Sequence, residues 1–333
     1  MPPVAEKLPA LVAMSAEHWP LLFPEDVRRR LEQFAFFDPA GPVDRFDDPR
    51  VLDRLADVEV LVTGWGCPVV DHRFLESAPK LRAVLHAAGS VKGHLSREVW
   101  ERGIAVSSAA AANAVPVAEF TLGAILLAGK GAFGLRERYR RDRTFQLGYI
   151  HSHVGNHGRT VGLIGASRIG RQVLDLLQPF GFRVQVYDPY AEDLGVPAVD
   201  LRTLLSTSDI VSVHAPLTME THQMLGRSEL ALLRNGATLI NTARGQLVDT
   251  EALTAELISG RITAVLDVTE PEPLPGDSPL FTLPNAFVTP HIAGSHGNEL
   301  ARLGLCVADE LGRFVAGEPL RFGIGAADLD RAA

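Results

Sequence analysis

The stretch Thr160-Val161-Gly162-Leu163-Ile164-Gly165-Ala166-Ser167-Arg168-Ile169-Gly170-Arg171-Gln172-Val173 decides the fold of the second half of this chain. Residues 160–164 are rich in apolar and β-branched side chains, which predicts a buried strand. From Ile169 onward, apolar residues recur at helical spacing as far as Phe180, which predicts a helix that begins at the glycine-rich turn. The chain therefore runs through a strand, a tight turn and a helix N-terminus in that order.

This order of elements is typical of a dinucleotide-binding turn, because helix N-terminal N–H groups and the helix dipole bind a pyrophosphate. Gly165 permits the turn, and Gly170 lets the helix approach the strand closely. Ser167 occupies the middle position of the turn, where glycine is usual. Its hydroxyl can donate to a phosphate, or its Cβ can push the cofactor outward. Asp188 closes the next strand, where a carboxylate binds ribose hydroxyls and repels a 2′-phosphate, so NAD is favoured over NADP. The alternative is a purely structural β-α-β unit in which Asp188 only ends a strand.

Short apolar runs alternate with helix-length periodic segments along almost the whole chain, which indicates the α/β class with parallel sheets and crossover helices. The predicted strands are 8–15, 58–63, 81–86 and 104–107 in the first third, and 160–164, 183–187, 209–214, 238–241, 264–268 and 287–289 later. Helices are predicted over 24–34 and 298–316, the latter packing on the first domain. A long apolar helix begins near Ala114, with Pro116 in its first turn, and links the domains.

Composition excludes several classes of protein. The 333 residues suffice for two domains, and 46% hydrophobic with 22% charged residues is ordinary for globular proteins. A net charge of −8 and the absence of a basic stripe argue against nucleic acid as a partner. Two distant cysteines indicate a reducing, cytoplasmic location. The most apolar stretch, 120–129, is shorter than the roughly 20 residues that a membrane span needs, so no membrane partner is expected.

Polar residues follow three further predicted strands: Asn241–Gly245, Asp267, and the run Thr289-Pro290-His291-Ile292-Ala293-Gly294-Ser295. Ligands of open α/β sheets bind at the carboxyl ends of the strands, so these residues are expected to converge on one site. Each also has a plain structural interpretation. Arg244 can be an exposed turn residue, Glu272 a solvated loop charge, and His291 a hydrogen-bonded core histidine.

In order and spacing, these motifs resemble the D-isomer-specific 2-hydroxyacid dehydrogenase family over essentially the whole chain. Four elements agree: the Gly165–Gly170 turn with Asp188, Asn-Thr-Ala-Arg-Gly at 241–245, Asp267 followed by Glu272, and Pro-His-Ile-Ala-Gly-Ser at 290–295. Glu-Phe-Thr-Leu at 119–122 matches the linker helix of the family. The resemblance implies an NAD-dependent oxidoreductase that transfers a hydride between NAD(H) and a small 2-oxo or 2-hydroxy acid.

The resemblance also assigns roles to residues. His291 is the general acid/base held by Glu272, and Arg244 binds the substrate carboxylate. Gly89 and Ser90, in the loop that follows His86, contact the substrate through backbone N–H groups. Relatives often carry Arg at position 86 and Asp at position 92, where this chain has His and Lys. The implied cofactor contacts are Gly165, Ser167, Arg168, Ile169, Gly170, Asp188, His214, Ala215, Pro216, Thr221, Thr242, Ala243, Asp267 and Gly294.

The predicted architecture is therefore two doubly wound parallel-sheet domains with the active-site cleft between them. Residues 1–112 and 293–333 form a flavodoxin-like substrate domain, and residues 113–292 form the Rossmann NAD-binding domain. The resemblance implies a homodimer, with the apolar linker helix as its interface. No metal is expected, since His151, His153 and His157 lack a nearby carboxylate or thiolate. Two rivals stay open: a dehydrogenase of another substrate, such as phosphite or a bulky aryl-oxo acid, and an NAD-sensing corepressor-like binding protein.

Overall fold

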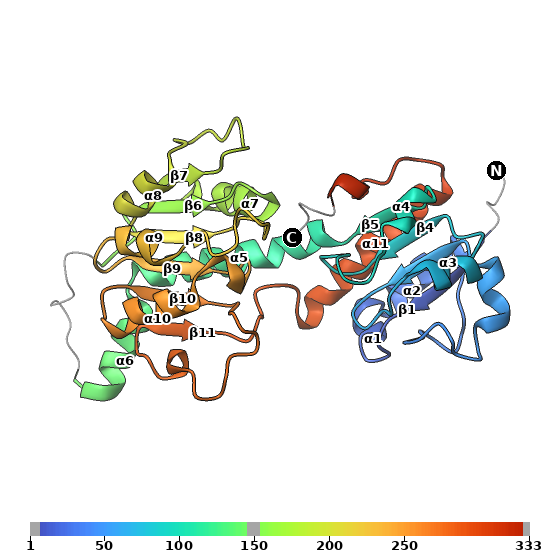
Figure 1. Cartoon of the computed structure of the whole chain (residues 1–333), viewed down its shortest axis with the longest axis horizontal. Coiled ribbons are helices and arrows are strands. Elements are labelled where there is room, and N and C mark those ends of the chain that lie inside the picture. The colour runs from blue at the N-terminus through green and yellow to red at the C-terminus, as the bar shows by residue number, and fades with distance from the viewer. Residues whose placement is uncertain (1–6, 145–153, 329–333) are drawn as a thin grey trace. The chain divides into compact units, whose positions relative to one another are not determined.

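The computed structural model describes residues 7–144 and 154–328 (Figure 1). These residues form two α/β units. One consists of the chain up to Asn113 together with the chain from Ser295 onward, and the other is Ala114–Gly294. The chain therefore passes from the first unit to the second and returns once, so that residues from both ends of the sequence share one core.

The first unit is built on five parallel strands. The strands are β1 (Leu8–Ala13), β2 (Ala35–Phe36), β3 (Val60–Thr63), β4 (Ala83–His86) and β5 (Ala105–Ser108). The helices are α1 (Trp19–Leu22), α2 (Glu25–Leu31), the 3-10 helix η1 (Leu52–Asp57), α3 (His72–Ser77), α4 (Glu98–Glu101) and, after the return, η4 (Gly297–Glu299), α11 (Leu300–Val315) and η5 (Ala326–Asp328). The strand order β2-β1-β3-β4-β5 is that of the predicted flavodoxin-like fold.

The second unit is built on six parallel strands. They are β6 (Thr160–Ile164), β7 (Arg183–Tyr187), β8 (Ile210–Val213), β9 (Thr238–Asn241), β10 (Thr263–Leu266) and β11 (Ala286–Val288). The longer helices are α5 (Ala110–Gly129), α6 (Ala132–Asp142), α7 (Arg168–Leu177), α8 (Leu201–Thr207), α9 (Arg227–Leu232) and α10 (Thr250–Ile258). The strand order is β11-β10-β9-β8-β6-β7, so the direction of winding reverses at β6 and places a topological switch point there.

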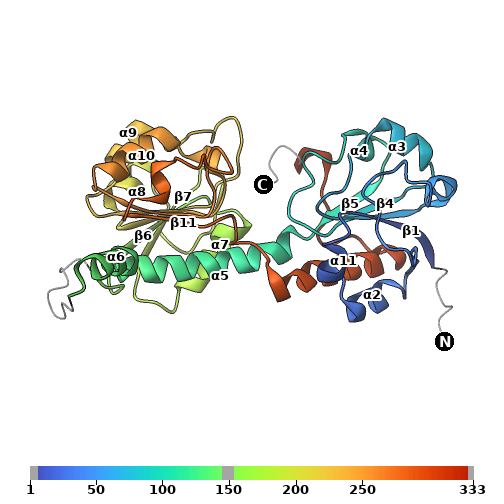
Figure 2. The same ribbon diagram turned by 90° about the horizontal axis from the view of Figure 1, so that it is seen from below.

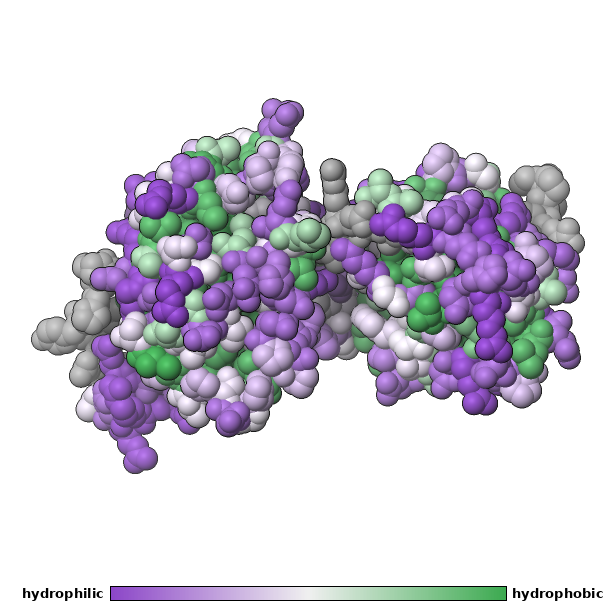
Figure 3. Space-filling model, viewed as in Figure 1, coloured by the Kyte–Doolittle hydropathy of each residue, from purple (hydrophilic) through white to green (hydrophobic). Residues whose placement is uncertain are grey.

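Each sheet is covered on both faces, which explains why its strands are apolar throughout. In the second unit α8, α9 and α10 lie on one face and α5 and α7 on the other, as Figure 2 shows. In the first unit, α1, α2 and α11 cover one face, and η1, α3 and α4 cover the other. Hydrophilic side chains predominate on the face of the molecule seen in Figure 3, and apolar groups are scattered among them.

The α/β class and both sheet architectures were predicted correctly, and the errors concern single elements. The strand β2 was not predicted, because two residues are too few to show an alternating pattern. The linker helix begins at Ala110 rather than near Ala114, so Pro116 lies inside it and not in its first turn. Alanines at 110–112 are strong helix formers and extend the helix backwards. The helix consequently lacks the hydrogen bond that the missing N–H of Pro116 would have donated.

The expectation that no apolar segment is long enough to cross a membrane was also wrong. Helix α5 is 20 residues long and, with a mean hydropathy of 1.6 over its most apolar part, is long and apolar enough to cross a membrane by length and composition alone. Core helices of soluble proteins share this property. Ala118, Ala124, Ile125 and Ala128 of α5 are buried in the core of the second unit, against residues of β6 and α7. We therefore interpret α5 as a core helix.

Candidate active site

The glycine-rich turn after β6 has the backbone shape that a dinucleotide-binding turn requires. Gly165 has a φ of +95°, a conformation that side chains disfavour, and a Cβ there would lie 2.6 Å from the backbone nitrogen of Ala215. A Cβ on Gly170 would lie 2.1 Å from the Gly165 carbonyl oxygen. Both glycines are therefore needed for the close approach of strand, turn and helix, and the turn fits a pyrophosphate at the N-terminus of α7.

Ser167, which replaces the usual middle glycine, has a defined place in this turn. It is the N-cap residue of α7, and its Oγ accepts a hydrogen bond from the Gly170 N–H at 3.5 Å. Arg168 and Ile169 are the first residues of the helix, whose leading N–H groups have no intrahelical acceptor. Since Oγ acts as an acceptor in this contact, its own hydrogen stays available for an anion in front of the helix.

Asp188 follows β7 and holds the turn from its other side. Its Oδ2 accepts a hydrogen bond from Ala166 N at 2.7 Å, and its Oδ1 accepts one from Tyr190 N at 2.8 Å. Each oxygen keeps a further lone pair, so the carboxylate can also accept from ribose hydroxyls. This second role, in which Asp188 ties the ends of β6 and β7 together, is not apparent from the sequence.

The segment after β8 packs directly against the turn. The His214 imidazole is buried, and its Nε2 lies 2.9 Å from Ser212 Oγ. Burial lowers the pKa of His214 to about 4. Its backbone and that of Ala215 are the atoms that Gly165 approaches. Thr221 Oγ1 donates to the Pro216 carbonyl at 2.6 Å and holds the following loop. Of these predicted cofactor residues, His214 and Ala215 therefore lie against the glycine turn, and Thr221 supports the backbone of the loop that follows.

Arg244 lies in the connection that follows β9. Asn241 shapes this connection, because its Oδ1 accepts from Ala243 N at 3.0 Å and its Nδ2 donates to the Arg244 carbonyl at 2.9 Å. A Cβ on Gly245 would lie 2.0 Å from the Thr269 carbonyl oxygen, so glycine allows the loops after β9 and β10 to touch. Burial lowers the pKa of Arg244, while the charge of Glu272 acts in the opposite direction. Thr242 Oγ1 lies 2.9 Å from Thr121 Oγ1 of α5, a partner that sequence analysis did not identify.

His291 and Glu272 form a close pair at this site. His291 Nδ1 lies 2.6 Å from Glu272 Oε1, and the two side chains are 50% and 43% exposed. Because Nδ1 is engaged, Nε2 is the nitrogen left to exchange a proton with a bound molecule. His291 has a φ of +55°, an unfavourable conformation for a residue with a side chain and one that is often found at functional sites.

Asp267 holds the backbone turn that carries His291. Its Oδ1 accepts from Thr289 Oγ1 at 2.6 Å and from Ile292 N at 2.8 Å, and its Oδ2 accepts from Ala293 N at 2.8 Å. Asp267 is 1% exposed. Its part in supporting the unusual conformation of His291 was not visible in the sequence. The predicted contact of Asp267 with the nicotinamide stays a prediction.

The strands β9, β10 and β11 are neighbours in one parallel sheet, so Arg244, Glu272 and His291 lie at the same edge. The edge thus presents a guanidinium with fork geometry and a histidine whose far side is held by a carboxylate. This combination can bind a carboxylate and transfer a proton to or from a neighbouring oxygen.

The predicted substrate residues Gly89 and Ser90 belong to the first unit, in the loop after β4, and both are half-buried. At the return of the chain, Asn113 Oδ1 accepts a hydrogen bond from Ser295 N at 2.9 Å. Gly294, a predicted cofactor residue, is the last residue of the second unit. In the chain it lies between Ala293, whose N–H donates to Asp267, and Ser295, whose N–H donates to Asn113.

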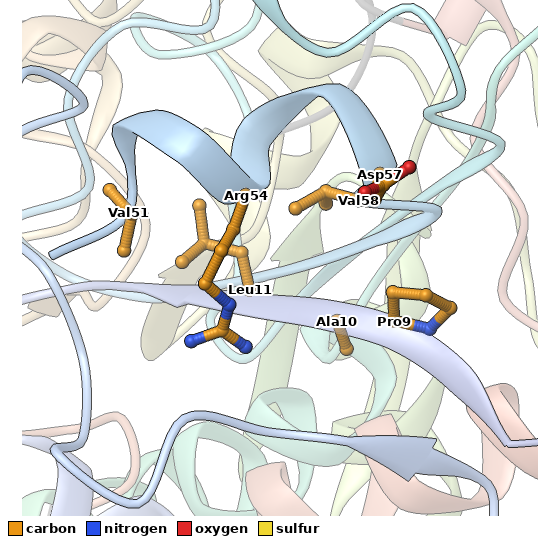
Figure 4. Close-up of a pocket in the computed structure, with 7 residues that line it drawn as sticks. All are labelled: Pro9, Ala10, Leu11, Val51, Arg54, Asp57 and Val58. Carbon is orange, nitrogen blue, oxygen red and sulfur yellow. The ribbon is translucent and has the colours of Figure 1, made fainter.

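Two other features do not contribute to the site. A small pocket lies under η1 (Figure 4), lined by Pro9, Ala10, Leu11, Val51, Arg54, Asp57 and Val58. Arg54 and Asp57 already pair with Asp38 and Lys80, and none of the lining residues is a predicted site residue. His151 and His153, considered for metal binding, lie outside the described residues, and His157 is exposed.

Comparisons with known proteins identify the family. Residues 122–293 match the model of the "D-isomer specific 2-hydroxyacid dehydrogenase, NAD binding domain". The chain is 36% identical to a D-3-phosphoglycerate dehydrogenase of Methanocaldococcus jannaschii over 80% of its own length, and it spans about half (52%) of that relative. It is 35% identical to a glyoxylate reductase of Korarchaeum cryptofilum, over 80% of this chain and 83% of the relative.

A solved structure shows the same architecture. A D-isomer-specific 2-hydroxyacid dehydrogenase of Xanthobacter autotrophicus Py2, in complex with NADPH and MES, is similar with a TM-score of 0.75 and 27% identity. The similarity covers 97% of this chain and 99% of that one. The chain therefore belongs to the D-isomer-specific 2-hydroxyacid dehydrogenase family, and residues 122–293 form its nicotinamide-cofactor-binding domain.

Proposed function

We propose that this protein is an oxidoreductase that transfers a hydride between NAD(H) and a small 2-oxo or D-2-hydroxy acid. The observation that carries the proposal is the 2.6 Å contact between His291 Nδ1 and Glu272 Oε1, at the sheet edge that also presents Arg244. A relative that matches over most of its length is named a glyoxylate reductase, which supports a small oxo acid as the substrate.

The residues supply what the reaction requires of the protein. The nicotinamide, when bound, supplies or accepts the hydride. During reduction, negative charge develops on the carbonyl oxygen of the substrate, and His291 donates a proton to it from Nε2. Glu272 stabilises the positive ring before this transfer and keeps its orientation. Arg244 binds the carboxylate of the substrate through two parallel hydrogen bonds. In the opposite direction, the neutral ring of His291 accepts the proton of the hydroxyl group.

The cofactor and substrate preferences rest on charge. Asp188 is oriented toward the glycine turn by its bond to Ala166 N, so a 2′-phosphate would be repelled and NAD is favoured. At position 86, where relatives often have Arg, burial lowers the pKa of the histidine to about 3. The position therefore carries no charge at neutral pH, which disfavours a substrate with an additional phosphate.

The test is the oxidation of NADH, followed beside NADPH, with glyoxylate, hydroxypyruvate, pyruvate, 2-oxoisocaproate and phenylpyruvate. The matched variants are His291→Ala and, as a control, His296→Ala, which alters an exposed histidine of the capping box at η4 (Gly297–Glu299). We expect turnover that prefers NADH and that falls by about 10² or more in His291→Ala only. Tight NADH binding without turnover of any acid would contradict the proposal and favour a sensor.

We also propose a homodimer formed through α5. Leu127 of α5 is 49% exposed, Phe287 of β11 is 41% exposed, and the Phe287 ring stacks on Phe133 of α6 with the centroids 4.6 Å apart. These exposed apolar groups belong to neighbouring elements and form a surface suited to a second copy. Light scattering of the protein and of Leu127→Glu tests this, since a charge at the interface is expected to give monomers.

A further inference from the structure

Tyr190 is a strongly exposed aromatic residue that is nevertheless held at two points. It follows β7 and is 79% exposed. Its backbone N–H donates to Asp188 Oδ1 at 2.8 Å, and its hydroxyl group donates to Glu220 Oε2 at 2.8 Å. A hydrogen bond to a carboxylate is stronger than one between neutral groups. The ring is therefore kept in one place although little of the protein covers it.

Glu220 lies in the loop between β8 and α9, and hydrogen bonds fix the shape of this loop. Thr221 Oγ1 donates to the Pro216 carbonyl at 2.6 Å and accepts from Thr218 N at 2.8 Å. Met219, next to Glu220 in the chain, is 98% exposed. Glu220 therefore stands at the tip of a well-defined projecting turn, and this turn places its carboxylate where it meets Tyr190.

The bond between Tyr190 and Glu220 joins the two loops on either side of the glycine-rich turn. In the sheet, β6 lies between β7 and β8. The turn follows β6 and touches both neighbours, since Asp188 Oδ2 accepts from Ala166 N at 2.7 Å and Gly165 packs on the backbone after β8. The contacts thus form a closed circuit at this edge of the sheet. It runs from the turn through Asp188 and Tyr190 to Glu220 and the loop after β8.

We propose that Tyr190 and Glu220 form a latch over the adenosine half of the cofactor site, which has to open each time NAD(H) enters or leaves. The inference rests on the proposed function, in which Asp188 binds the adenosine ribose and the turn binds the pyrophosphate, and it adds control of the cofactor. Asp188 and the turn are both members of the circuit, so a molecule held by both lies within it. The bond between Tyr190 and Glu220 is the exposed member, and it can break without disturbing the sheet.

A latch has a kinetic signature that a direct contact with the cofactor lacks. The bond is present in the free protein, as the structure shows, and it forms again once the cofactor has entered. Because both entry and exit need the open state, loss of the bond accelerates association and dissociation by the same factor and leaves the affinity unchanged. A side chain that contacts the cofactor instead changes dissociation and affinity together.

The test is stopped-flow fluorescence of NADH binding, with dissociation measured by displacement with excess NAD. Tyr190→Phe keeps the ring and removes the hydroxyl group that bonds to Glu220. We expect both rate constants to rise about fivefold, the equivalent of one exposed hydrogen bond, with the NADH Kd within about twofold of the wild type. Glu220→Ala should have the same effect, and the double variant no more, because the two side chains act through one bond. Glu220→Gln keeps an acceptor oxygen and should lie closer to the wild type.

The matched control is Tyr139→Phe, which removes the hydroxyl group of another exposed tyrosine of the same unit, on α6. Its rate constants should equal those of the wild type. Unchanged rate constants in Tyr190→Phe would overturn the inference, as would an equal change in Tyr139→Phe or a larger change in the double variant. Faster dissociation with a matching rise in Kd would also overturn it, since Tyr190 would then contact the cofactor directly.

These measurements need no substrate acid, so the latch and the proposed function can fail separately. The expected rate changes in a protein that reduces none of the oxo acids would contradict the proposed function alone. Turnover of an oxo acid with NADH, together with unchanged cofactor rate constants in Tyr190→Phe, would contradict the latch alone.

Discussion

Replacement of Glu272 by Gln removes the negative charge beside His291 and little else. The amide keeps an oxygen about 2.6 Å from Nδ1, the distance in the structure, so the ring can keep its orientation. What is lost is the attraction between the carboxylate and the positive ring that must donate a proton during reduction. The reaction is therefore expected to slow while both ligands still bind.

The structure sets the size of the effect. A hydrogen bond to a charged group contributes about 1.5–3 kcal/mol, but both side chains are about half exposed, and solvent screens the charge. The lower end of the range, about 1.5 kcal/mol, corresponds to a roughly tenfold loss of kcat/KM. Glu272→Ala also removes the orientation of the ring, and we expect a loss of about 10².

The assay is the steady-state rate of NADH oxidation with the best oxo acid, with the NADH Kd measured separately by fluorescence. The control is Glu270→Gln, a neutralised carboxylate in the same loop that makes no side-chain contact with His291 in the described structure. An unchanged kcat/KM in Glu272→Gln, or an equal loss in Glu270→Gln, would refute the assignment of Glu272 as the partner of the general acid.

Three further predictions follow from the geometry. Arg244→Lys keeps the charge but loses the planar fork, so the KM for the oxo acid should rise by about 10² while the NADH Kd, measured by fluorescence, is unchanged. Asp188→Ala removes the repulsion of a 2′-phosphate, so the ratio of the NADPH to the NADH Kd should fall by about tenfold, and the loss of the bond to Ala166 N should weaken NADH binding itself. Burial lowers the pKa of His86 to about 3 and that of His214 to about 4, whereas an unfolded histidine titrates near 6.5. Below pH 6.5 the unfolded chain binds more protons, so each histidine should remove roughly 1.4 kcal/mol of stability per pH unit down to its folded pKa. Urea unfolding between pH 7.5 and 5 measures this loss, and a flat profile would contradict it.

The α/β class was predictable because the signal of each strand and helix is local, whereas the two sheet architectures were expected from the family resemblance. A strand buried on both faces is apolar throughout, as at Thr160–Ile164, where the predicted and observed bounds are identical. The ends of elements were less predictable. The start of α5 at Ala110 depends on whether alanines continue a helix or enter a loop, and neighbouring structure decides this.

The candidate catalytic residues were identifiable from their motifs, since Arg244, Glu272 and His291 follow successive segments with characteristic spacing. The residues that support them were not identifiable from the sequence. Asp267 is 1% exposed and accepts hydrogen bonds from Thr289 Oγ1, Ile292 N and Ala293 N. Only the path of the backbone after β11 brings these donors to one carboxylate.

The sequence by itself determined which chemical groups this protein has and in what order they follow the strands: a glycine turn, an acidic residue after the next strand, an arginine and a histidine. Chain order and local periodicity are sufficient for that. Tertiary structure decided which of them touch, such as Glu272 and His291 at 2.6 Å, or Thr63 and the neutral ring of His86 at 2.8 Å. Hydrogen bonds and pKa shifts depend on distances and burial between residues far apart in the chain, and those exist only after the sheets have formed.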